Sequence, residues 1–125
     1  MIKTSYTKKC HNSFGNSSQT VVDSLIWVSG IMGIDPSDNQ LVKGGTDAEI
    51  KMLIKNMSEC LSHAFTSWSN ILKLQIYLTD INDFEKVDAA LKEVLGETKP
   101  IYTVMEVSKL LSGANVCIDA VAAAF

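Results

Sequence analysis

The hydrophobic pattern of the chain changes its period between Thr46 and Thr79, and this change constrains the fold more than any other feature. Apolar residues first recur at three- and four-residue steps, as on one face of an α-helix: Ile50, Leu53, Ile54, Met57, Leu61, Ala64, Phe65 and Trp68. Apolar and other residues then alternate, as in a half-buried β-strand, with Leu72, Leu74, Ile76 and Leu78 on the apolar side. A helix followed at once by a strand predicts a layered α/β structure.

Local signals place the ends of two helices. Thr46 and Glu49 have the spacing of a capping box, in which each side chain would bind the backbone amide of the other residue. Asp80 or Asn82 can cap a second helix that ends at Gly96. Its apolar face holds Phe84, Val87, Leu91 and Val94.

The stretch after Gly96 is predicted to be a strand. Pro100 prevents the helix from resuming, and residues 101–107 are rich in β-branched and aromatic residues. Alternation along a strand would place Tyr102, Val104 and Glu106 on one face, and Ile101, Thr103, Met105 and Val107 on the other.

Shorter β signals lie at both ends of the chain. Residues 2–6 are predicted as a short first strand, and residues 19–22 and 25–29 as a hairpin. Turn-forming residues fill 35–40, and residues 116–125 have strong β character. We therefore expect residues 1–125 to form a single domain of two layers, with both helices on one face of one sheet.

The sheet face opposite the helices predicts self-association. Trp27, Tyr77, Tyr102 and Val121 are large for a face left in water. We therefore expect an oligomer in which these sheet faces pack together.

Composition argues against several classes of protein. The net charge is -3, and all eleven basic residues are lysine, so no arginine and no basic cluster is present to gather nucleic acid. No run of about 18 apolar residues is present to span a membrane. Three widely spaced cysteines without a CxxC pair fit a reduced compartment, and we expect a cytoplasmic protein. We expect no cofactor and no metal, because Cys60 and His63 with Cys10 and His11 match no usual zinc spacing.

A series of short motifs in the order of the chain resembles the Rid family, also called YjgF-type and often labelled endoribonuclease L-PSP or translation inhibitor. The matching segments are GNSSQTV at 15–21, VSG at 28–30, IDP at 34–36, LV at 41–42, TDINDF at 79–84, Pro100 with EV at 106–107, and IDAVA at 118–122. The resemblance covers nearly the whole chain with similar spacing.

This resemblance implies a homotrimer of the chorismate-mutase-like α/β fold, with three clefts between subunits. Better-known members of the family hydrolyse reactive enamines and imines to 2-keto acids and ammonia. In them an arginine on the late strand clamps the substrate carboxylate, and a glutamate on the last strand helps to place the attacking water. The implied ligand is thus a small carboxylate-bearing metabolite of the 2-imino or 2-keto acid kind.

Carried over by position, the resemblance implies a ligand-binding set of Ser17, Ser29, Gly30, Asp88, Tyr102, Thr103 and Cys117. Tyr102 stands at the position of the arginine, and Cys117 at that of the glutamate if the intervening loop has no gap. Ser17 replaces an aromatic residue of the early loop, and Asp88 a common asparagine. The chain therefore resembles a divergent member of the family, in which a tyrosine hydroxyl, or a point charge from Lys73 or Lys109, would have to replace the arginine fork.

Two function classes follow from these residues. The first is a Rid-type imine or enamine hydrolase, and the second is a non-catalytic trimer that senses a ligand or binds another protein. Ribonuclease activity as the main role is disfavoured, because two histidines and no basic cluster provide a poor phosphate site. For Cys117, a nucleophile and an inert buried thiol are the alternatives, and a cysteine in a β-rich strand favours the inert one.

Overall fold

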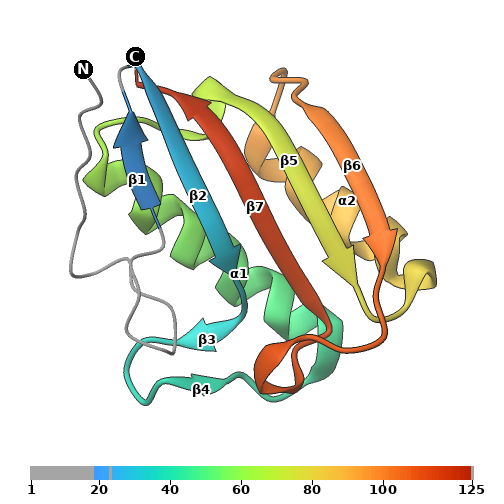
Figure 1. Ribbon diagram of the computed structural model, residues 1–125. Helices are drawn as coiled ribbons and strands as arrows, with labels where there is room; N and C mark the ends of the chain where they lie inside the picture. The colour runs from blue at the N-terminus through green and yellow to red at the C-terminus, as the bar shows by residue number, and fades with distance from the viewer. Residues whose placement is uncertain (1–18, 23, 125) are drawn as a thin grey trace.

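Two helices cover the same face of a five-stranded sheet in the computed structural model, which describes residues 19–22 and 24–124 (Figure 1). The opposite face of the sheet, called the open face below, carries no helix in the described part of the chain. The elements are β1 (Gln19–Val22), β2 (Leu25–Ile31), β3 (Ile34–Asp35), β4 (Gln40–Leu41), α1 (Gly45–His63), β5 (Ile71–Leu78), α2 (Phe84–Leu95), β6 (Ile101–Glu106) and β7 (Val116–Ala123). Three 3₁₀ turns lie at Trp68–Asn70, Ile81–Asp83 and Leu111–Gly113.

The strands form a mixed sheet in the order β1-β2-β7-β5-β6. β5 and β6 are parallel and are joined through α2, as a crossover connection requires, whereas the other neighbours are antiparallel. β1 and β2 pair from Val22 opposite Leu25, which confirms the predicted hairpin. The predicted two-layer α/β architecture, with both helices on one face of one sheet, is therefore confirmed (Figure 1).

The core lies between the sheet and the helices. Leu74, Ile76 and Leu78 of β5 are fully buried, as the alternation along this strand predicts. Their partners on the helices include Leu53, Met57, Leu61, Val87 and Leu91, which are also fully buried. Each such side chain contributes about 1.5–3 kcal/mol by leaving water.

The first helix ends earlier than its hydrophobic pattern predicts. α1 stops at His63, and Phe65 has a positive φ of 60° with a side chain that is 92% exposed. Trp68 is buried, but in the following 3₁₀ turn, where its indole N–H donates to Ser58 Oγ at 2.8 Å. The apolar spacing in the sequence therefore extends beyond the end of the helix, because the positive φ of Phe65 interrupts the helical backbone.

The predicted capping box is wrong. Gly44 is the N-cap of α1, and no side chain of the described residues caps the helix. Thr46 lies inside the helix, where its hydroxyl donates to Asp83 Oδ2 at 2.6 Å, and the buried Glu49 carboxylate accepts bonds from Asn115 at 2.7 Å. Both side chains therefore bind residues distant in sequence rather than the backbone amides at the start of the helix.

Two side chains lie on a different side of the sheet from the one predicted. The pairing of β5 with β7 shifts between Ile71 and Lys73, so Ile71 is buried and Leu72 is 48% exposed. Tyr102 pairs with the buried Leu74 in the parallel register and packs against the core beside the helices. The prediction that Tyr102 shares the open face with Trp27 is therefore wrong.

Neither described helix has the length and apolar character needed to cross a bilayer. The strand predicted at residues 2–6 falls outside the described residues.

Candidate functional site

The predicted site residues that the structure describes fall into two separate groups. The first group lies on sheet strands, toward the open face, and comprises Ser29, Gly30, Thr103 and Cys117. The second group lies on the helix side of the sheet, at its β6 edge, and comprises Asp88 and Tyr102. Ser17 lies outside the described residues.

A pocket of about 490 Å³ opens on the open face. We call it the sheet pocket, and its lining includes Trp27, Ser29, Lys73, Gln75, Ile101 and Asp119. Strands β2, β7, β5 and β6 all contribute to it, so it crosses most of the width of the sheet. It combines apolar walls with one cation, one carboxylate, one hydroxyl and one amide, a mixture typical of sites for small polar ligands.

Asp119 is the polar centre of the sheet pocket. Its Oδ1 accepts the backbone N–H of Gly30 at 2.7 Å, and its Oδ2 lies 3.2 Å from the hydroxyl of Tyr77. The same hydroxyl lies 3.3 Å from Gln75 Oε1, but it has one proton, and a charged carboxylate is the stronger acceptor. Asp119 was not among the predicted site residues.

Gly30 sits where the pairing of β2 with β7 shifts, between Val28 and Ile31. Its φ of +69° is a conformation that glycine adopts at little steric cost. At this irregularity the Gly30 amide donates to the Asp119 side chain. Ser29 and Gly30 therefore lie together at this strand irregularity, and Ser29 lines the sheet pocket.

Cys117 is a buried thiol. It packs with Met32 and Ala114, and Tyr77 covers the cluster. Burial, and secondly the negative charge of Asp119, raises the pKa of the Cys117 thiol to about 12. The thiol is therefore protonated at neutral pH and serves neither as a carboxylate substitute nor as a thiolate nucleophile there.

A second pocket, of about 430 Å³, lies at the β6 edge of the sheet. We call it the edge pocket, and it is lined by residues of α2, of β6 and of the connection between them, including Asp88, Lys92, Thr98, Lys99, Pro100 and Tyr102. Asp88 Oδ2 binds Lys92 Nζ at 2.7 Å. Within the described chain, Lys99 has no ion-pair partner.

Tyr102 is a hydrogen-bond donor in the edge pocket. Burial, followed by the nearby charge of Asp88, raises the pKa of the Tyr102 hydroxyl. The hydroxyl therefore keeps its proton at neutral pH and can donate one hydrogen bond to an anion. With Lys99 beside it, the edge pocket can hold a carboxylate by a point charge and a neutral donor.

One copy of the chain does not bring the two groups together. Ser29 on β2 and Thr103 on β6 both belong to the open face, but three strand spacings separate these strands, about 14 Å. Tyr102 lies on the other side of the sheet from both. A small 2-imino or 2-keto acid, with about six or seven heavy atoms, cannot touch all of these residues in a single copy.

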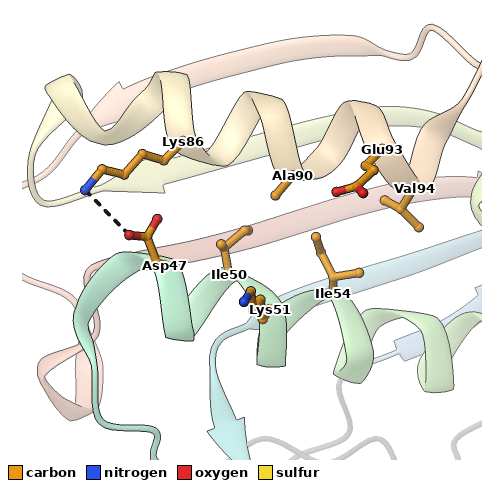
Figure 2. Close-up of a pocket in the computed structure, with 8 residues that line it drawn as sticks. All are labelled: Asp47, Ile50, Lys51, Ile54, Lys86, Ala90, Glu93 and Val94. Carbon is orange, nitrogen blue, oxygen red and sulfur yellow. Dashed lines mark ion pairs between the residues drawn. The ribbon is translucent and has the colours of Figure 1, made fainter.

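A third hollow, of about 630 Å³, lies between α1 and α2 (Figure 2). Its apolar floor includes Ile54 and Val94, and Lys86 pairs with Asp47 across one end at 3.9 Å. None of the predicted site residues that the structure describes lines it. In the described part of the chain, no three His, Cys, Asp or Glu side chains cluster closely enough to hold a metal ion.

Comparisons with known proteins identify the family. Residues 8–124 match the family model described as endoribonuclease L-PSP. The chain belongs to this family, which is also known as the Rid or YjgF family. The resemblance expected from the sequence motifs is therefore confirmed.

Individual Rid relatives match over almost the whole chain. The human 2-iminobutanoate/2-iminopropanoate deaminase is 39% identical over 117 residues, covering 93% of this chain and 85% of the human protein. A RutC family protein of Pyrococcus abyssi is 34% identical over 118 residues, covering 94% and 93%. The crystal structure of a Yersinia pestis member of the conserved Rid family, YyfA, superposes with a TM-score of 0.90 at 26% identity, covering 97% and 99%.

Proposed function

We propose that this Rid protein hydrolyses small 2-imino acids to 2-keto acids and ammonia, in clefts that form between copies of a homotrimer. The main support for this proposal is that the polar groups of the site are divided between two pockets. The sheet pocket and the edge pocket each hold part of the polar groups, and in one copy they lie on opposite sides of the sheet, with Ile101 lining the first and Tyr102 the second. Packing the open face of one copy against the β6 edge of the next would join them.

The open face has the surface that such packing needs. Trp27, Leu72, Ile101 and Met105 are between 39% and 67% exposed, and Trp27, Leu72 and Ile101 line the sheet pocket. Large apolar side chains gathered on one face of a folded domain are typical of an interface. Light scattering should therefore give three times the chain mass of 13.7 kDa.

The edge pocket supplies the groups for the substrate carboxylate. Lys99 provides a positive charge and Tyr102 a hydrogen-bond donor, in a chain without arginine. The human relative is named for 2-iminobutanoate and 2-iminopropanoate, which both carry a carboxylate beside the imine. A lysine can neutralise the charge of such a group and a tyrosine can donate a hydrogen bond to it, although without the planar fork of arginine.

The experiment is hydrolysis of 2-iminobutanoate, generated in the assay from 2-aminobutanoate by an amino-acid oxidase. Loss of the imine and formation of 2-oxobutanoate are followed beside the human deaminase and a sample without protein. Turnover well above the spontaneous rate supports the proposal. A well-folded oligomer that leaves the spontaneous rate unchanged contradicts it.

A non-catalytic ligand-binding trimer is the second candidate, and the lack of arginine favours it. In that case 2-oxobutanoate would stabilise the fold without any turnover of the imine. A ligand at 100 times its dissociation constant adds about 2.7 kcal/mol to the free energy of unfolding. A thermal melt with the keto acid, run beside the turnover assay, separates the two candidates.

A further inference from the structure

We infer that Asp119 is the catalytic base of this site, the carboxylate that orients and deprotonates the attacking water. The inference rests on the proposed imine hydrolysis and names the residue that would carry its central step. Asp119 lines the sheet pocket and is half-buried, so it is both shielded and reachable.

No other described strand residue of the open face carries a carboxylate. The side chains around Asp119 that titrate are Lys73 and Tyr77 from β5 and Cys117 from β7 itself. β2 contributes Trp27 and Ser29, which carry no charge. Cys117 and Tyr77 both keep their protons at neutral pH, because burial raises the pKa of each. Asp119 is thus the group on this face that can accept a proton from water.

Hydrogen bonds hold the Asp119 carboxylate in place and leave acceptor sites open. Oδ1 accepts from the Gly30 amide at 2.7 Å, and Oδ2 from the Tyr77 hydroxyl. A carboxylate oxygen has two acceptor positions, so each oxygen keeps one for a water molecule in the pocket. A base whose orientation is fixed by a backbone amide and a side chain needs little reorganisation when the water reacts.

The proposed step conserves atoms and charge. Asp119 takes one proton from water as the water oxygen bonds to the imine carbon of the protonated imine, and the C=N electron pair moves to nitrogen. In the resulting carbinolamine, Asp119 returns the proton to nitrogen, the C–N bond breaks and ammonia leaves. The remaining hydroxyl passes its proton to the departing ammonia, which leaves the ketone and ammonium. Iminium and water thus give keto acid and ammonium.

The test compares Asp119→Asn with Asp119→Glu and with Asp38→Asn. The amide of Asn can still accept the Gly30 bond but cannot take a proton, whereas Glu keeps the carboxylate. Asp38 is an exposed loop residue outside the pockets, so Asp38→Asn controls for the loss of one charge. The pH profile of kcat and the thermal melt are recorded for each variant.

We expect Asp119→Asn to lower kcat by about a hundredfold or more and to remove the fall in rate at acidic pH. Asp119→Glu should retain that acidic fall with a smaller loss of kcat, and Asp38→Asn should match the wild type. If Asp119→Asn turns over the imine as fast as the wild type does, the assignment of Asp119 is overturned while the proposed function stands. Absence of turnover in the wild type overturns the proposed function as well. If Asp119→Asn does not fold, the test rests on Asp119→Glu. The assignment is overturned if the rate of this variant no longer falls at acidic pH.

Discussion

The backbone N–H of Gly30 donates a hydrogen bond of 2.7 Å to Oδ1 of Asp119, which lies 89 residues further along the chain. The bond joins an irregularity in β2 to the polar centre of the sheet pocket. The conformation of Gly30 and the orientation of the Asp119 carboxylate are therefore coupled.

Replacing Gly30 with alanine should lower both stability and activity. A Cβ at Gly30 would meet no atom within 4 Å, so the cost comes from its φ of +69° alone, about 1–2 kcal/mol of unfolding free energy. Gly113→Ala is the matched control, because Gly113 also has a positive φ and open space around a Cβ. Urea unfolding should show similar losses for both variants, whereas only Gly30→Ala should lower kcat. Equal kcat values would show that the Gly30 amide does not orient Asp119.

Asn115→Ala should destabilise the fold strongly for a single polar change. Glu49 is 1% exposed, and Asn115 gives it a backbone bond and a side-chain bond, both of 2.7 Å. Removing the side-chain donor leaves one oxygen of a buried carboxylate without that partner, at a cost of about 1–3 kcal/mol. Urea unfolding beside Lys86→Ala, which breaks an exposed pair worth at most about 1 kcal/mol, checks this. Equal losses in the two variants would contradict it.

The stability of the protein should fall at alkaline pH because of Cys117. The pKa of its thiol is raised from the ordinary 9.0 to about 12, so the folded state holds this proton more tightly than the unfolded chain does. The resulting stabilisation is complete below pH 9 and is lost as the pH rises through the folded pKa. Urea unfolding between about pH 8 and 10.5 should show a smaller decline in Cys117→Ala than in the wild type. Part of the decline should remain in both the wild type and the variant, because the pKa of Tyr77 is also raised.

Lys99→Gln should weaken substrate binding at the edge pocket. Losing a charge-assisted contact to the substrate carboxylate costs about 1.5–3 kcal/mol, which raises KM for 2-iminobutanoate by about tenfold or more. Lys43→Gln is the control, because Lys43 is exposed and lines neither the edge pocket nor the sheet pocket. A KM that changes equally in both variants would show that Lys99 acts only through net charge.

The spacing of apolar residues predicted those helices and strands that bury one face along their own length. The apolar alternation of β5 and the helical spacing from Ile50 to Leu61 correspond to buried faces in the structure, since both patterns arise from burial on one side. The same patterns were wrong at Phe65 and Leu72, where a positive φ and a shift of register interrupt the period. Neither interruption has a local sequence signal.

The site was harder to predict, because its contacts are distant in sequence. Asp119 looked like an ordinary strand residue, and its partners Gly30 and Tyr77 lie 89 and 42 residues away. Motif resemblance predicted Ser29, Gly30 and Tyr102 as site residues, of which Ser29 lines the sheet pocket and Tyr102 the edge pocket. It could not show on which side of the sheet Tyr102 lies, since that depends on the pairing of β6 with β5.

Subunit complementation tests the central claim, that each site is shared between two copies, most directly. Chains carrying Tyr102→Ala and chains carrying Asp119→Asn are unfolded together in urea, refolded as an equimolar mixture and assayed with 2-iminobutanoate. If each site takes Tyr102 from one copy and Asp119 from the next, random mixing in a cyclic trimer restores about one quarter of the wild-type sites. Each variant refolded alone should show only its own reduced rate. Mixed trimers that form, as native mass spectrometry would show, and yet regain no activity would contradict the shared site.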